Sequence, residues 1–111
     1  MTPTTSTFAS GGVRITLTSS LDGHRGALAV AGEIDLCTQG AFGAALAGLA
    51  AAGATEVALD LSEVTFAGAS LLHELATARA AGAMPTIASA TPSVHRVLVA
   101  GGLAADLQLV A

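Results

Sequence analysis

Three side chains of this sequence carry groups that act as nucleophiles or bases: the hydroxyl of Ser70, the imidazole of His73 and the thiol of Cys37. Ser70 and His73 are three residues apart, which places them one turn apart on a helix. A hydroxyl nucleophile and its base can use that spacing, but a triad also needs a carboxylate that orients the imidazole. None is evidently placed to do so, and the sequence therefore predicts no hydrolase chemistry from these residues.

Ligand patterns for metals and phosphate groups are equally weak. His24, His73 and His95 are widely separated and lack metal-ligand spacing. The pair Gly11-Gly12 is not followed by the Lys-Ser/Thr ending of a phosphate-binding loop. Cys37 is interpreted as a small space-filling residue. The sequence accordingly predicts no metal site and no cofactor.

The composition limits the classes of partner. The chain has 111 residues, of which 52% are hydrophobic and 11% charged, and its formal net charge is −4. Such a composition describes one folded domain and not a disordered chain. All four basic residues are arginines that lie far apart in the sequence. Direct binding to nucleic acid is therefore not expected, because it requires a clustered basic surface.

Two segments bear on the location of the protein. The apolar run over residues 44–54 is about half as long as the roughly 20 residues of a membrane span, so no span is expected. Residues 1–12 are rich in Thr and Ser and lack the pattern of a secretory signal. They are predicted to form a flexible lead-in to a single domain over residues 13–111. A lone cysteine forms no intrachain disulfide, which is compatible with a cytoplasmic protein.

Periodic patterns indicate the elements that position the reactive groups. Residues 13–18 alternate between apolar and polar, which predicts a half-buried strand, interpreted as an edge strand. Asp22-Gly23 predicts a tight turn into a second strand over residues 27–31. Apolar residues then recur at helical spacing, and Thr38 is expected to cap this helix with its side chain.

The second half of the chain alternates between strands and helices. The patterns predict a buried central strand over 57–61, a helix over 70–81, a strand over 84–88, a helix from Thr91-Pro92 and a last strand over 107–110. The order is ββαβαβαβ. This order is typical of the α/β class, with a mixed, mostly parallel sheet and helices packed on it.

Several short stretches share an order and spacing with a known family. They are Gly32-Glu33-Ile34-Asp35, residues 57–66, residues 94–98 and Gly101-Gly102-Leu103. In these stretches the chain resembles the STAS domain family, of the anti-sigma factor antagonist type, from about Val13 to its end. The resemblance implies a small regulatory module that binds an anti-sigma serine kinase and so frees a sigma factor. It implies neither enzymatic activity nor contact with DNA.

The chain departs from the family at the position of its switch. In regulated members the segment after the Phe reads Asp-Ser-Ser-Gly-Leu, and the kinase phosphorylates the first Ser. The corresponding residues here are Gly68-Ala69-Ser70-Leu71-Leu72. Ala69 has no hydroxyl, so the usual phosphoacceptor is lost. The sequence predicts an antagonist whose binding is not controlled by phosphate at this position.

The resemblance also implies where a partner binds. The candidate residues are Asp35, Thr38, Gly68, Ala69, Ser70 and His73. Ser70 is predicted to cap the helix that follows, and the alternative of a displaced phosphorylation site stays open. Asp35 has two open roles, because it can favour the positive end of the first helix or contact a partner.

Other roles within the family remain alternatives. One is an accessory subunit of a lipid-handling ABC transporter, and another is a different STAS signalling scaffold. STAS domains commonly add a final helix after the last strand, and this pattern is not apparent up to Ala111. One face of the sheet is therefore expected to be undercovered. Such a face favours burial by a larger partner or by self-association into a homodimer.

Overall fold

The computed structural model describes residues 3–102. The elements follow one another as β1 (Thr4–Ser10), β2 (Val13–Asp22), β3 (Arg25–Ile34), α1 (Gln39–Ala51), β4 (Glu56–Ala67), α2 (Ala69–Ala80), β5 (Met84–Ala90) and α3 (Pro92–Ala100). The five strands lie in one sheet in the order β1-β2-β3-β4-β5. β1, β2 and β3 pair antiparallel, whereas β3, β4 and β5 pair parallel. The predicted α/β class with a mixed sheet is confirmed. The expectation that the sheet is mostly parallel is wrong for the described strands, because β1 adds a second antiparallel pair to the one between β2 and β3.

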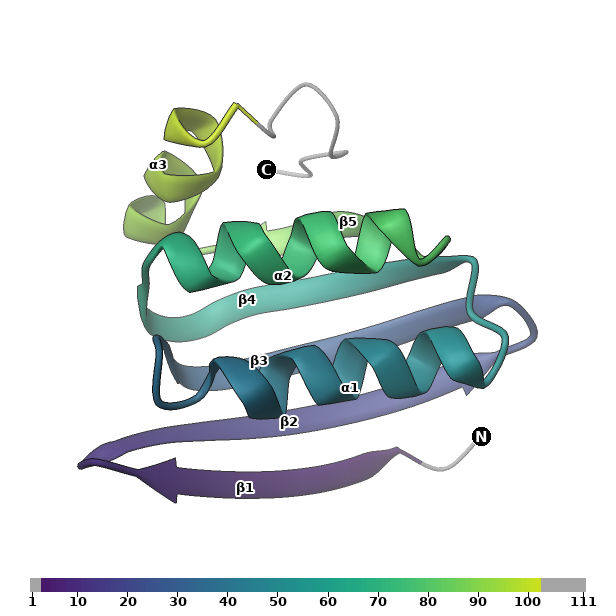
Figure 1. The fold of residues 1–111 in the computed structure, drawn as a ribbon, viewed down its shortest axis with the longest axis horizontal. Coiled ribbons are helices and arrows are strands. Elements are labelled where there is room, and N and C mark those ends of the chain that lie inside the picture. The colour runs from purple at the N-terminus through teal and green to yellow at the C-terminus, as the bar shows by residue number, and fades with distance from the viewer. Residues whose placement is uncertain (1–2, 103–111) are drawn as a thin grey trace.

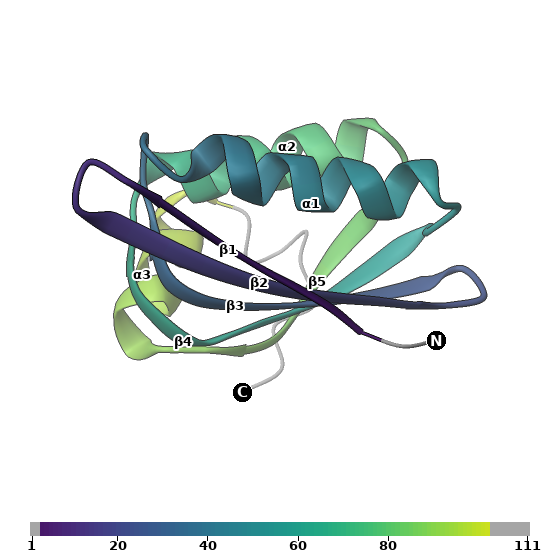
Figure 2. The same cartoon turned by 90° about the horizontal axis from the view of Figure 1, so that it is seen from below.

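The helices are distributed unevenly over the sheet. Figure 1 shows α1 and α2 lying side by side in front of the strands, and Figure 2 shows both on the same side of the sheet. α3 lies beyond α2, where it packs against β4. Thr91 links α3 to β4. Its hydroxyl donates to the Val64 carbonyl of β4 at 3.3 Å and accepts from the Val94 amide of α3 at 3.4 Å. Among residues 3–102, the opposite sheet face carries no comparable helical layer (Figure 2).

The core lies between the sheet and the paired helices because the apolar residues of both point there. α1 contributes Phe42, Leu46 and Leu49, as its helical spacing predicts. On β4 the alternate residues Val57, Leu59 and Leu61 are all 0% exposed. Since β4 pairs with β3 on one side and β5 on the other, the prediction of a buried central strand is confirmed.

The N-terminal segment differs from its prediction. Residues 1–12 are predicted as a flexible lead-in, but residues 4–10 form β1 along the edge of β2. All seven residues of β1 are exposed, so the strand lacks the alternation that marks a half-buried one. Thr5 and Thr7 instead hydrogen-bond Thr18 and Thr16 of β2 at 3.0 and 3.1 Å. The chain therefore begins its fold earlier than its apolar pattern indicates.

Other differences follow from the first. β2, predicted as an edge strand, lies inside the sheet because β1 covers its outer side. The described order is βββαβαβα, in place of the predicted ββαβαβαβ.

The strand predicted over 107–110 lies outside the described residues. Within residues 3–102, no helix is both long and apolar enough to cross a membrane.

Candidate functional site

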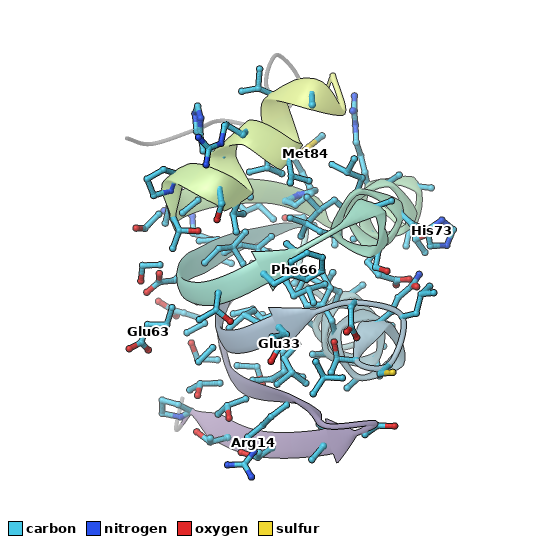
Figure 3. All side chains as sticks on the ribbon, turned by 90° about the vertical axis from the view of Figure 1, so that its left-hand side faces the viewer. Arg14, Glu33, Glu63, Phe66, His73 and Met84 are labelled. Carbon is cyan, nitrogen blue, oxygen red and sulfur yellow. The ribbon has the colours of Figure 1, made fainter. Side chains whose placement is uncertain are left out.

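Most of the candidate residues meet where two strands end and two helices begin. The β3–α1 loop carries Asp35 and Thr38, and the β4–α2 junction carries Gly68 and Ala69. The loops are joined by the Gly68 amide, which donates to the Ile34 carbonyl at 3.2 Å. Figure 3 looks onto this end of the molecule, with Phe66 beside Glu33 and His73 projecting from α2. The structure thus brings the two predicted segments together.

A glycine shapes the strand that leads into the first loop. Gly32 has a φ of 106°, a left-handed conformation that other residues rarely adopt. A side chain at this position would collide with the backbone carbonyl of Arg14 on β2. The pairing of β3 with β4 also shifts register between Gly32 and Glu33. The positive φ and the close approach of the Arg14 carbonyl together explain why a glycine begins the Gly32-Glu33-Ile34-Asp35 segment.

The β3–α1 loop is held by reciprocal polar contacts. The carboxylate of Asp35 accepts from the amides of Cys37 and Thr38 at 2.8 and 3.3 Å. The hydroxyl of Thr38 donates to the Glu33 carbonyl at 2.6 Å and accepts from the Asp35 amide at 3.0 Å. The predicted side-chain cap by Thr38 is therefore wrong, because its hydroxyl closes the loop and does not cap α1. Thr38 is 1% exposed, so it supports the loop from inside and is not available for direct partner contact.

The β4–α2 junction is built differently. Gly68 occupies the N-cap position of α2, and no side chain supplies a capping hydrogen bond. The predicted cap by Ser70 is therefore wrong, since Ser70 lies inside the first turn and is 8% exposed. Ala69 is exposed at the start of the helix. The position that carries the phosphoacceptor in regulated STAS proteins, by the family resemblance, is here an accessible methyl group.

A shallow apolar hollow lies beside Ala69. It has a volume of about 260 Å³ and is lined by Leu36, Gln39, Ala69, Ser70 and His73. Leu36 is 86% exposed, and Phe66, at the end of β4, is 54% exposed. Large apolar side chains exposed together are typical of binding surfaces. We call Leu36, Phe66, Ala69 and the hollow the loop surface.

Sequence reasoning missed the two apolar side chains of the loop surface and the polar bridge behind it. Gln39 of α1 donates through its side-chain amide to the Glu74 carboxylate of α2 at 2.8 Å. The carboxylate sits over Gly43 of α1, and a Cβ atom there would overlap it. The exposed imidazole of His73 approaches the same carboxylate at 3.9 Å. Leu36 and Phe66 could have been found in the sequence as large apolar residues beside the two predicted loops. The hydrogen bond between Gln39 and Glu74 could not, because it depends on how the two helices pack.

The reactive groups lie apart from one another in the described part of the chain. No hydrogen bond joins Ser70 to His73 in this part of the chain, and no group of three or more His, Cys, Asp or Glu side chains there is placed to hold a metal ion. Cys37 is exposed, so its interpretation as a space-filling residue is wrong. What these residues offer is a surface and not an enclosed pocket.

Comparisons with known proteins agree with this fold. A family model described as Mlab, STAS domain matches residues 17–111. A crystal structure of an anti-sigma factor antagonist from Mycobacterium paratuberculosis is 26% identical with a TM-score of 0.76, over 86% of this chain and 84% of that chain. The anti-sigma factor antagonist SpoIIAA in its unphosphorylated form is 13% identical with a TM-score of 0.73, over 86% of this chain and 88% of that chain. No curated protein sequence matches the chain.

The family model covers most of the chain, including both loops of the loop surface. The two solved structures share the mixed sheet and its helices over a similar extent. The resemblance found in the sequence is confirmed: the chain belongs to the STAS domain family and has the fold of its anti-sigma factor antagonists.

Proposed function

We propose that this protein is a cytoplasmic antagonist that binds an anti-sigma serine kinase through the loop surface, and that it does so without phosphorylation at position 69. It controls the availability of a sigma factor by binding and not by catalysis. The observation that carries the proposal is the exposed methyl group of Ala69 beside exposed Leu36 and Phe66.

The apolar side chains support a binding role. A few apolar anchors that become fully desolvated supply much of the affinity of a protein interface. Leu36 stands on a loop whose backbone is fixed by Asp35 and Thr38, so it is displayed from a rigid base. An anchor held in this way loses little conformational entropy when a partner covers it.

The lost hydroxyl supports constitutive binding. A phosphate adds about −1.5 to −2 charges, which would have to be desolvated or matched in the interface. Ala69 accepts no phosphate, and Ser70 is 8% exposed, so its hydroxyl is poorly placed for an incoming kinase site. Phosphorylation at position 69 therefore cannot release the proposed complex.

Affinity capture from the source cell with the purified protein tests the choice of partner. We expect recovery of an anti-sigma kinase by the wild type and its loss with Leu36→Glu, because a charge replaces an anchor. Met84→Glu is the matched control, since Met84 is also an exposed apolar residue, 39% accessible, but lies at the start of β5. Recovery of a transporter ATPase would instead support the alternative of a lipid-transport accessory subunit.

Incubation of the recovered kinase with ATP tests the missing switch. The wild type should gain no phosphate and stay bound, whereas Gly68→Asp/Ala69→Ser should be phosphorylated and released. A Cβ atom at Gly68 would make only ordinary contact, 3.7 Å from the Phe66 ring, so the double variant fits the fold. Phosphate on Ser70 of the wild type, with loss of binding, would contradict the proposal.

A further inference from the structure

The two edges of the sheet differ in how they are protected. β1 and β5 form the outer strands, at opposite sides of Figure 1. Natural edge strands are commonly blocked by proline or by charged residues. β5 contains Pro85, which has no amide hydrogen to offer. β1 has neither proline nor charge, so its outer backbone groups remain suited to pairing with another strand.

An apolar groove lies directly beside β1. Phe8 pairs with buried Ile15 and so belongs to the sheet face that α1 covers, yet Phe8 is 49% exposed. Phe8 is itself one of the residues that line a groove of about 220 Å³, together with Ala41 and Ala44 of α1 and the strand residues Ser6 and Leu17. The edge therefore presents an exposed aromatic side chain and, along it, a hollow whose other lining residues are mostly small.

These two features fit each other across a two-fold axis. If β1 pairs antiparallel with β1 of a second copy, the longest register places Thr7 opposite Thr7 of that copy. Ser6 then lies opposite Phe8 of the second copy, on the same face of the sheet. Each Phe8 thus reaches over the groove of the other subunit. A surface that is complementary to itself in this way is the requirement for a closed symmetric dimer.

No charge on β1 opposes pairing with a second copy. The chain carries a formal net charge of −4, which opposes self-association in general. No residue between Thr4 and Val13 is charged, so the symmetric pairing brings no like charges together on the strand. We propose that β1 is a homodimer interface, in which two copies join their sheets edge to edge and exchange Phe8 side chains. This inference is independent of the kinase proposed as partner.

Charges placed on the axis test the proposal. Thr7 is exposed and meets its own counterpart in the proposed register, so Thr7→Lys and Thr7→Glu should each lose the dimer through like-charge repulsion. An equimolar mixture of the two variants should form a mixed dimer. The molar mass of the full chain, measured by light scattering or sedimentation over a range of concentrations, gives the readout.

Further variants separate a contact through β1 from a contact through another surface of the molecule. Phe8→Ala should weaken the dimer without adding charge, and Ala88→Lys, at an exposed position on the other edge, should leave it intact. Circular dichroism shows whether each variant is folded. A wild type that is monomeric at every concentration would overturn the proposal. So would a folded Thr7→Lys variant that dimerises as well as the wild type, because the contact would then lie elsewhere.

Discussion

The two helix starts of the loop surface are built in opposite ways. Before α1, Asp35 and Thr38 hold the backbone through side-chain hydrogen bonds, two of them at 2.8 Å or less. Before α2, Gly68 and Ala69 offer no side-chain cap, and a backbone contact to Ile34 holds the junction. The first start is a fixed frame for Leu36. At the second start, the exposed side chain of Ala69 makes no capping hydrogen bond, so a substitution there should cost the fold little.

Thr38→Val is the strongest test of this comparison. Valine keeps the shape of threonine but leaves the Glu33 carbonyl and the Asp35 amide without their partner at a partly buried site. We expect the free energy of unfolding to fall by about 1–3 kcal/mol. Urea unfolding measures the change. Ala69→Ser, at the other start, should alter stability by no more than about 0.5 kcal/mol, and equal losses in the two variants would refute the comparison.

Asp35→Ala is expected to have the next largest effect. It removes the acceptor for the Cys37 and Thr38 amides at the entrance to α1. Loss of an acceptor of this kind costs about 1 kcal/mol. Asp35→Asn keeps an acceptor oxygen and should recover most of that loss in the same unfolding measurement. If both variants were equally destabilised, the charge of Asp35 would matter more than its hydrogen bonds.

Asp60 of β4, like Asp35, accepts hydrogen bonds from residues that follow it, and its pKa offers a further test. The hydroxyl and the amide of Ser62 both donate to the Asp60 carboxylate, at 2.6 and 3.0 Å, and together lower the pKa of Asp60 below its ordinary value. A pKa lowered by folding adds stability above the ordinary value, and that stability is lost as the pH falls through the lowered pKa. Ser62→Ala should raise the pKa of Asp60 in an NMR titration. The effect on stability should be small because Asp60 is exposed.

How much of the fold was predictable depends on burial. β4 and α1 place their large apolar residues on the core side, so periodicity indicated them. β1 is exposed along its whole length, and its pairing rests on threonine contacts that leave no apolar period. The resemblance identified Asp35, Ala69 and their neighbours as one site. It did not predict that Thr38 would be buried, because that depends on the path of the loop.

The missing side chain of Gly43 has a consequence for recognition. Because Glu74 occupies that space and accepts from Gln39, α1 and α2 are fastened near the ends that display Leu36 and Ala69. The two helices are therefore tied to each other by a side-chain hydrogen bond as well as by the core. A partner that docks on the loop surface, as proposed, would meet a shape that exists beforehand, and selectivity would come from the fit of that shape more than from mutual adjustment.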